Sequence, residues 1–461
     1  MYQLTIALEP GSKTPMYEQL YRFFAGEIRA GRLSHGEKLP SKRALCAHLG
    51  ISRSTVETAY SLLTAEGYLT ARPQSGFYVS DYAVFDAPEA EPADQPDTQP
   101  EVPVPAELDF STASVDVSLF PYASWAKLNK ETVYGQPELL QRGERQGDKA
   151  LRCALCAFLS EYRGVKCAPE QIVVGAGQEY LSGLLLQLLP RDGVFGVEDP
   201  GYAAIANSVR SFGRELRYLP QDGAGVAVAG LEAAGVSVAF ITPSHQFPLG
   251  ITRPADRRSR LLRWAAEGAD RYIIEDDYDS EFRYASRPIP AMQGMDTAGR
   301  VVYTGTFSRS LAPSIRIAYA VLPPALLERY RCFGGYRLST VSRYEQAVMA
   351  RFLSEGFYAR YLRRVGNLYR RRRAALIPAL ESIPGVRISG SGGGIHFLLT
   401  DSRYSEPELI SRAALQGISL RGLSSYCRHA VPIPSTLVVG YGGLRDERIP
   451  DAAARLRDAW T

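Results

Sequence analysis

Apolar residues recur at helical spacing in three stretches near the start of the chain. Residues 15–31 begin with a proline, and Leu20 and Ile28 then lie on one face. The next two stretches each start with a serine, Ser41 in LPSKRALCAHLG and Ser52 in ISRSTVETAYSLL. Serine is a preferred N-cap because its hydroxyl accepts a hydrogen bond from an amide of the first turn. The pattern therefore predicts three short helices.

A glycine-containing turn at Gly50 joins the second and third of these helices, which is a helix-turn-helix pattern. The segment GYLTARPQSGFYVS then alternates like a hairpin with Gly76 near its tip, and we interpret it as a wing. The later helix would enter the major groove of DNA with its first residues at base edges. The candidate DNA contacts are Arg53 and Thr55 to bases, Ser52 and Ser54 to phosphates or base edges, and Lys42 and Arg43 to the DNA backbone. An all-helical docking module is the alternative, but charged and hydroxyl residues crowd the start of this helix and favour DNA binding.

Short apolar runs alternate with helical stretches from about residue 108 onward. The runs are IVVGAG, VFGVED, VAFITPSH, RYIIEDDY, RVVYTGTFS and IAYAVLP. Such alternation predicts an α/β fold with a mostly parallel sheet covered by helices, in a large domain of about 108–324. A long helix from about 340 and the strands GGIHFLL and TLVVGYGGL predict a smaller α+β domain at about 325–461. Ligands of such sheets bind outside the carboxyl ends of the strands.

The charge distribution separates the chain into parts. Of the 461 residues, 45% are hydrophobic and 22% are charged, and the net charge is only +4. Residues 1–80 nevertheless carry nine Lys or Arg against six acidic residues, which suits a DNA-binding domain. Residues 81–107 carry eight acidic residues, six prolines and no Lys or Arg. We expect an extended acidic linker there, followed by one aminotransferase-sized unit at 108–461.

Cysteine usage and hydropathy bear on the compartment. The six cysteines are scattered, which suits reduced thiols in the cytoplasm. Cys153 and Cys156 form a CxxC within ALRCALCAFLSEY, whose apolar spacing indicates a helix face rather than a metal or redox pair. The run LSGLLLQLL is too short to span a membrane. We therefore expect a cytoplasmic protein with no metal and no membrane partner.

The N-terminal segment resembles the GntR-type winged helix-turn-helix, whose signature is LPSxRxLAxxLGxSRxTVxxAYxxLxxEGY. This chain has LPSKRALCAHLGISRSTVETAYSLLTAEGY, which matches nearly every position. The resemblance implies a reader of double-stranded DNA operators.

The stretch RVVYTGTFSRSLAPSIRIAYAVLPP, residues 300–324, predicts a buried strand, a small hydroxyl-bearing turn and a short helical segment. Such a turn with Thr306 and Ser308 makes an anion site, and Arg316 adds a fork-shaped cation for a phosphate. Further polar candidates also follow strands: Gly177 and Gln178 in VVGAGQEYL, Tyr202 in EDPGY, Gln246 in TPSHQFPLG, and Asp276 and Tyr278 in IIEDDYDSEF. A carboxylate there can pair with a pyridine nitrogen, and a phenol can reach a ring oxygen. Singly, these residues are equally typical of strand ends, surface loops or a metal site.

Taken in this order, the motifs resemble the MocR regulators, in which a GntR-type reader is fused to a fold type I aminotransferase-like domain that binds pyridoxal phosphate (PLP). The resemblance implies that Tyr202 stacks on the ring, Asp276 holds the pyridine nitrogen, and Tyr278 and Gln246 hold the ring oxygen. The phosphate would be surrounded by Gly177, Gln178, Thr306, Ser308 and Arg316. The family's Schiff-base lysine is replaced by Arg309, and no lysine follows Lys166. A guanidinium stays protonated and is a poor amine nucleophile, so covalent attachment of PLP is not expected.

The resemblance implies a transcription regulator whose aminotransferase-like domain dimerises and senses a small molecule. The cavity would hold PLP noncovalently, hold a PLP–amino acid adduct or another small anion, or serve only as a dimer scaffold. A PLP-dependent aminotransferase with a regulatory appendage is the alternative from another class, and the missing lysine argues against it. Family members use an arginine before the LxxGY strand for a substrate carboxylate. The run here is VPIPSTLVVGY, which has none, so Arg421 or Arg428 would have to substitute.

Overall fold

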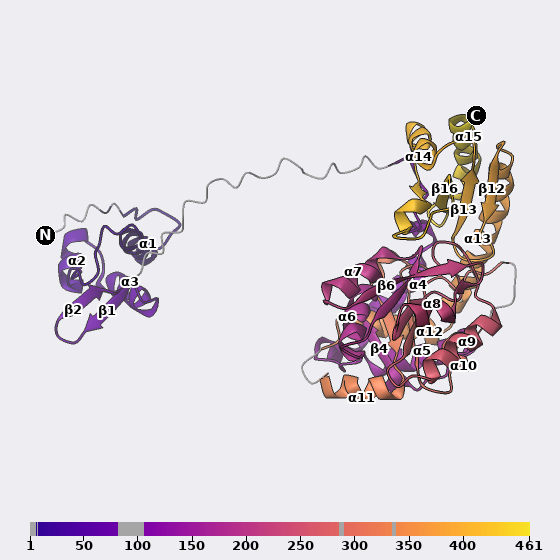
Figure 1. Ribbon diagram of the computed structural model, residues 1–461. Helices are drawn as coiled ribbons and strands as arrows, with labels where there is room; N and C mark the ends of the chain where they lie inside the picture. Colours follow the sequence, from indigo (N-terminus) through magenta and orange to yellow (C-terminus); the bar gives the residue numbers. More distant parts are fainter. Residues whose placement is uncertain (1–5, 7, 82–105, 285–289, 334–337) are drawn as a thin grey trace. The chain divides into compact units, whose positions relative to one another are not determined.

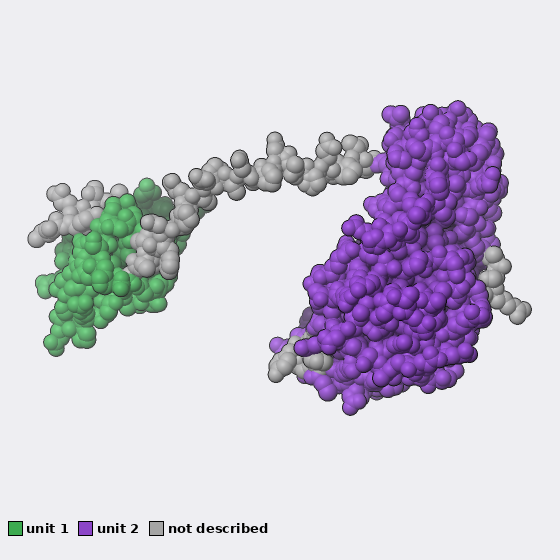
Figure 2. All heavy atoms as spheres, viewed as in Figure 1, with its two compact units in different colours: residues 1–102 green, residues 103–461 purple. Residues whose placement is uncertain are grey.

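A computed structural model describes residues 6, 8–81, 106–284, 290–333 and 338–461 (Figure 1). The chain divides into two compact units, residues 1–102 and residues 103–461 (Figure 2). Most of the acidic linker predicted at 81–107 lies outside the described residues. The two units are therefore described separately.

The first unit contains three helices and a two-stranded antiparallel hairpin. Ser41 and Ser52 cap the second and third helices as predicted, since their hydroxyls accept hydrogen bonds from the amides of Ala44 and Thr55, each at 3.2 Å. Leu20 and Tyr60 lie in the fully buried core between the helices. The elements are α1 (Met16–Arg29), α2 (Lys42–Leu49), α3 (Arg53–Ala65), β1 (Leu69–Arg72) and β2 (Gly76–Val79).

An eight-stranded sheet forms the centre of the second unit, in the order β4-β11-β10-β9-β8-β5-β6-β7. The neighbours from β10 to β6 are parallel, whereas β11 and β7 run antiparallel to theirs. This mostly parallel sheet confirms the predicted α/β class. The strands are β4 (Ile172–Gly175), β5 (Phe195–Asp199), β6 (Leu216–Asp222), β7 (Gly225–Val226), β8 (Val238–Ile241), β9 (Tyr272–Asp277), β10 (Val301–Thr306) and β11 (Ala318–Val321).

Helices cover both faces of this sheet, which is why its strands are continuous apolar runs. On β4, Val174 packs with the residues of α5 and α12, whereas its neighbour Val173 packs with those of α6 and α7. The described helices of this part are α4 (Tyr122–Gly135), α5 (Lys149–Arg163), α6 (Gln178–Leu188), α7 (Ala203–Ser211), α8 (Val228–Ala233), α9 (Ala255–Ala266), α10 (Met292–Met295), α11 (Pro324–Phe333) and α12 (Arg343–Ser354).

A smaller antiparallel sheet, in the order β12-β13-β16-β15, lies in the C-terminal part of the same unit. Its strands are β12 (Val386–Ser389), β13 (His396–Asp401), β15 (Arg421–Gly422) and β16 (Thr436–Gly440), and its helices are α13 (Phe357–Glu381), α14 (Glu406–Leu415) and α15 (Ile449–Trp460). Strand β3 (Leu108–Asp109) pairs with β14 (Ile418–Ser419), so the start of the second unit is tied to this C-terminal part. None of the helices within the described ranges has the length and apolar character needed to cross a membrane.

Candidate functional site

A cavity lined by charged, hydroxyl and aromatic side chains opens at the carboxyl ends of the parallel strands. Its lining combines side chains that follow β4, β5, β8, β9 and β10, so segments far apart in sequence meet at one sheet edge. The lining residues are Gln178, Glu179, Tyr202, Thr242, Phe247, Asp276, Tyr278, Thr306, Ser308, Arg309 and Arg316.

Asp276 is the buried carboxyl group of this cavity. Strand alternation turns it to the opposite side from Glu275 and Asp277, and the register places Thr304 of β10 beside it. The Thr304 hydroxyl donates to Asp276 at 3.1 Å and accepts from the Gln178 amide at 3.1 Å. Burial raises the pKa of Asp276 to about 7, although the Thr304 hydrogen bond opposes the shift. Asp276 can therefore exchange a proton with a ligand near neutral pH.

Asp277 points away from the cavity and has a structural partner. The Arg163 guanidinium donates to it at 2.6 Å, and the Tyr303 hydroxyl donates at 2.7 Å. Burial would raise the pKa of Asp277, but Arg163 and the hydrogen bonds outweigh it and hold that pKa below its usual value. Two neighbouring carboxyl groups of one strand are thus driven to opposite protonation states by their surroundings.

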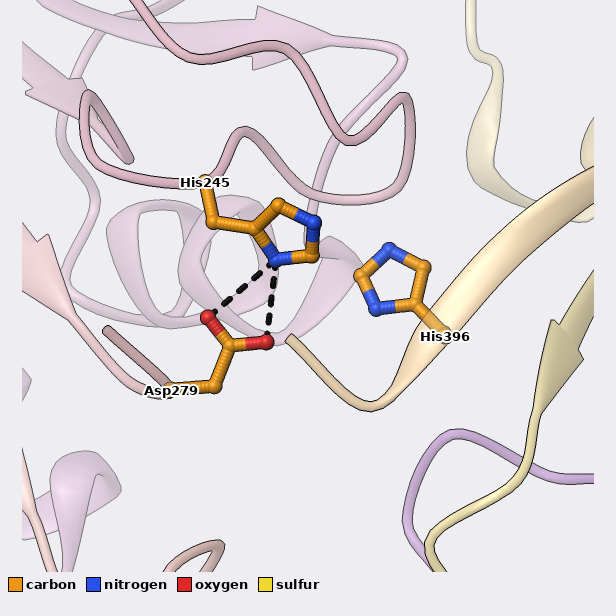
Figure 3. Close-up of side chains that lie close together, drawn as sticks. All are labelled: His245, Asp279 and His396. Carbon is orange, nitrogen blue, oxygen red and sulfur yellow. Dashed lines mark hydrogen bonds and ion pairs between the residues drawn. The ribbon is translucent and has the colours of Figure 1, made fainter. Parts of the chain in front are cut away.

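Tyr278 lines the cavity and contacts a buried histidine–aspartate pair. Figure 3 shows this pair, His245 and Asp279, beside His396. The Tyr278 hydroxyl lies 3.2 Å from His245 Nδ1, and the same nitrogen lies 2.9 Å from Asp279 Oδ2. Because a carboxylate only accepts hydrogen bonds, Nδ1 carries the proton that Asp279 accepts. The ring of His396, from β13, lies 4.7 Å from that of His245. The contact between the His245 and His396 rings joins a loop of the large sheet to the smaller sheet. His245 in turn fixes the position of Tyr278.

His245, Asp279 and His396 are also the one group of three potential metal ligands within the part of the chain that the structure describes. Their candidate ligand atoms lie within 4.8 Å of one another, whereas Zn²⁺ bonds of ~2.0–2.1 Å would hold them about 3.4 Å apart. Burial and the neighbouring His245 hold the pKa of His396 well below its usual value, so its imidazole is neutral. Asp279 holds Nδ1 of His245 and the Pro248 carbonyl holds Nε2 of His396, whereas His245 Nε2 is buried with no hydrogen-bond partner among the described residues. The expected absence of a metal stays a prediction.

Hydroxyl groups and an arginine gather at one end of the cavity. The Thr306 hydroxyl accepts from the Ser308 amide and lies 3.1 Å from the Ser308 hydroxyl. Arg316 has a φ of +51°, an uncommon conformation for a residue with a side chain, and its guanidinium pairs with Glu179. Gly177, with a φ of +92°, lies against that guanidinium, and a Cβ there would be 2.2 Å from Arg316 Nη2. The glycine thus permits the guanidinium to lie close to the backbone at this end of the cavity.

Arg309 adds a second cation to the cavity lining. Its Nη1 atom is buried and has no hydrogen-bond partner among the described residues, and no carboxylate of the described ranges forms an ion pair with it. Burial and Asp279 raise the pKa of Tyr278 well above its usual value, and the charge of Arg309 opposes this rise. An unpaired buried guanidinium nitrogen is a donor that an anionic ligand can satisfy.

Tyr202 and Gln246 differ in how well their placement suits their predicted roles. Tyr202 lines the cavity mouth, 45% exposed, with its ring 6.0 Å from that of Phe247. Gln246 is buried and does not line the cavity, since its amide donates to the carbonyls of Pro200 and Phe247 and accepts from the Leu249 amide. Gln246 therefore cannot hold a ring oxygen in this conformation, and its side chain shapes the turn instead. Phe247 occupies the cavity wall in its place.

Other lining or supporting residues were not predicted. Glu179 and Phe247 lie beside residues that the sequence motifs indicated, so proximity in sequence was the available signal. His396 had no such signal, because it reaches His245 only through the packing of β13. Arg421 and Arg428 do not line the cavity, and the backbone amide of Arg428 is held by Asp199 at 2.8 Å.

The predicted DNA contacts gather around the start of α3 in the first unit. The Ser52 hydroxyl lies within 2.9 Å of those of Ser54 and Thr55. The Arg53 side chain is 79% exposed, and its Nε donates to Glu57 at 3.0 Å, while Lys42 Nζ approaches the same carboxylate at 3.6 Å. Glu57 thus holds two cations at the surface where DNA would approach. Arg43 is exposed on α2.

Two cations that were not predicted lie at the wing. Gly76 opens β2 with a φ of +119°, as a tight hairpin requires. Arg72 belongs to β1, whereas Lys38 precedes α2 and forms a β-bridge with Tyr78 of β2. Lys38 and Arg72 both lie over the Tyr78 ring, at 5.8 and 4.4 Å from its centroid. Such cations have the charge that DNA phosphates attract.

Comparison with known proteins agrees with this two-part architecture. Residues 16–79 match the model of the bacterial regulatory proteins of the gntR family, and residues 108–432 match that of the class I and II aminotransferases. The HTH-type transcriptional regulator YdeL of Bacillus subtilis is 37% identical over 97% of both chains. The rhizopine catabolism regulatory protein MocR of Rhizobium meliloti is 34% identical over 99% of this chain and 96% of its own. The pyridoxine biosynthesis regulator PdxR of Corynebacterium glutamicum is 30% identical over 99% and 98%.

Solved structures confirm the fold of the second unit. The multiple substrate aminotransferase of Thermococcus profundus superposes with a TM-score of 0.68 at 24% identity, covering 77% of this chain and 91% of its own. An archaeal alanine:glyoxylate aminotransferase gives a TM-score of 0.69 at 22% identity over 77% and 90%. The molecule is thus a GntR-type helix-turn-helix joined to a fold type I aminotransferase-like domain. The chain belongs to the MocR-type family of HTH transcriptional regulators.

Proposed function

We propose that this regulator binds a bipartite DNA operator as a homodimer and that its cavity reversibly binds a phosphorylated pyridine such as PLP. The observation that carries the proposal is the cavity lining, which includes Asp276, Tyr278, Arg309 and Arg316. By the family resemblance, Arg309 stands at the position of the Schiff-base lysine. A guanidinium forms ion pairs and hydrogen bonds rather than an aldimine. Binding without a covalent bond follows from that replacement.

The lining residues suit such a ligand, which would supply a flat ring with a basic nitrogen, a ring oxygen and a phosphate. Asp276 would hold the proton of the ring nitrogen, because its pKa of about 7 places that proton within easy exchange. The Tyr278 hydroxyl, held by His245, would meet the ring oxygen. Arg316 and the hydroxyls of Thr306 and Ser308 would meet the phosphate. Tyr202 would cover the ring at the mouth.

Regulation would follow from a difference in ligand affinity between two states of the dimer. A ligand shifts a conformational equilibrium only by its differential affinity for the two states. A dimer presents two DNA-reading domains, so a change in their spacing changes affinity for a two-half-site operator. The relative PdxR is a transcriptional regulator of pyridoxine biosynthesis, which supports a B6-type ligand here.

Titration with PLP, followed by borohydride reduction and intact-protein mass spectrometry, tests the proposal. We expect the wild type to bind PLP reversibly by equilibrium dialysis and to gain no mass, whereas Arg309→Lys gains one phosphopyridoxyl group. A covalent adduct on the wild type would overturn the proposal. Steady transamination of any amino acid by the wild type would establish the enzyme alternative. Operator affinity that no B6 phosphate alters would establish a scaffold.

DNA binding is tested by anisotropy with operator fragments selected from a random pool. We expect the full chain to bind a two-half-site sequence more tightly than either half-site alone. Equal affinity for one and two half-sites would contradict dimeric recognition.

A further inference from the structure

We infer that the ligand of this cavity is a phosphorylated pyridine that carries a carboxylate, and that Arg309 binds that carboxylate. The inference rests on the proposed function and names the chemical class of its ligand. It is carried by the buried Nη1 atom of Arg309, which lines the cavity and has no partner among the described residues. The ligand would thus have two anionic groups, one for each arginine.

The two arginines of the cavity face different surroundings. Arg316 lies against Gly177 and already has a carboxylate partner, Glu179, at the cavity end that holds Thr306 and Ser308. Arg309 opposes the rise in the pKa of Tyr278 that burial causes, whereas Tyr202 senses both arginines. Arg316 is thus paired within the protein and Arg309 Nη1 is not, so a second anionic group of the ligand has its own cation to bind.

The guanidinium of Arg309 has no carboxylate partner among the described residues. Its Nη1 atom is buried and makes no hydrogen bond within the described ranges. Asp279, the nearby carboxylate, lies against His245 at 2.9 Å. A carboxylate of a ligand would supply both the acceptor and the negative charge that Arg309 lacks.

Carboxylate chemistry also matches the donor geometry of a guanidinium. Carboxylates accept two parallel N–H bonds from an arginine fork, whereas an aldehyde offers one neutral oxygen and an ammonium offers only like charge. We therefore expect ligand affinity to rank carboxylate above aldehyde above amine. Charge-assisted hydrogen bonds of this kind correspond to a preference of about tenfold or more.

Isothermal titration of the full chain with four phosphorylated pyridines tests this order. The probes are 4-pyridoxic acid 5′-phosphate, an N-phosphopyridoxyl amino acid, PLP and pyridoxamine 5′-phosphate. The first two carry the carboxylate on the ring or on an amino-acid arm, so their relative affinities show which source the cavity favours. We expect at least one of them to bind about tenfold or more tightly than PLP, and pyridoxamine 5′-phosphate to bind least.

Variants assign the preference to Arg309. In Arg309→Met and Arg309→Gln we expect the carboxylate ligands to lose their advantage while PLP affinity changes little. Arg260→Met, at an exposed arginine of α9, is the matched control and should leave the order unchanged. A wild type that binds all four probes equally, or an advantage that survives both variants, overturns this inference alone. A wild type that binds none of them overturns the proposed function together with it.

Discussion

The buried carboxyl group of Asp276 gives the second unit a specific dependence of stability on pH. Only 8% of the residue is exposed, and the hydrogen bond from Thr304 does not offset the loss of water. Its pKa rises from 3.8 in the unfolded chain to about 7 in the folded protein. Between these values the folded state binds more protons than the unfolded state, so stability falls as the pH rises. Above pH 7 the loss is nearly complete.

The loss from this one group amounts to about 3 kcal/mol between pH 5 and pH 8, since the interval spans nearly two units below the folded pKa and one pKa unit corresponds to ~1.4 kcal/mol. Asp276→Asn removes the titrating group and keeps its shape. We therefore expect the free energy of unfolding of the variant to gain about 3 kcal/mol relative to the wild type over this range. Comparing two proteins cancels the contribution of Glu275 and Glu281, whose pKa values burial also raises, to about 7 and about 8.

Urea unfolding followed by tryptophan fluorescence measures this difference at pH 5, 6, 7 and 8. All three tryptophans, Trp125, Trp264 and Trp460, lie in the second unit, so the signal excludes the DNA-binding unit. Asp256→Asn, at an exposed carboxylate of α9, serves as the control and should give a profile parallel to the wild type. A parallel profile for Asp276→Asn as well would refute the reasoning, because Asp276 would then be ionised in the folded protein.

Three further substitutions follow from individual contacts. Arg163→Met leaves Asp277 as a buried charge without its guanidinium, and we expect it to lower the free energy of unfolding by about 3–5 kcal/mol at pH 7 in urea titrations. Arg53→Ala should weaken operator binding by about 1–3 kcal/mol in anisotropy at fixed salt, whereas Arg22→Ala on α1 should not. Asp279→Asn should weaken PLP binding several-fold by loosening His245 and Tyr278, without changing affinity for DNA, as parallel titrations would show.

The sequence predicted the helices and strands well where the interactions that form them join residues close together in the chain. The serines that cap α2 and α3 act through amides three residues away, so spacing alone located both helix starts. Strand alternation likewise turns Asp276 to the opposite side of β9 from its two sequence neighbours. The motif EDDYD was enough to locate this residue in the sequence. The GntR and aminotransferase resemblances placed both folds correctly.

Such local signals did not predict the direction of individual side chains or the packing of residues far apart in the sequence. Gln246 is next to Phe247, and only the shape of the turn decides which of them reaches the cavity. His396 supports the site from another sheet, 151 positions beyond His245, because the smaller sheet packs against that loop. Lys38 and Arg72 come together only when the segment before α2 and strand β1 both pair with β2, since both cations lie over the ring of Tyr78.

By the family resemblance Arg309 stands where a Schiff-base lysine would, and noncovalent binding suits a regulator for a thermodynamic reason. A Schiff base also forms reversibly, but without one the ligand leaves the cavity with no bond to hydrolyse. A sensor needs reversible binding and a difference in affinity between two states. Gln178 donates to Thr304, Thr304 donates to Asp276, and Tyr278 lies against His245, so none of these contacts depends on the side chain at position 309. In the proposed function the cavity therefore keeps these contacts without a covalent anchor, and the guanidinium of Arg309 adds selectivity for an anion.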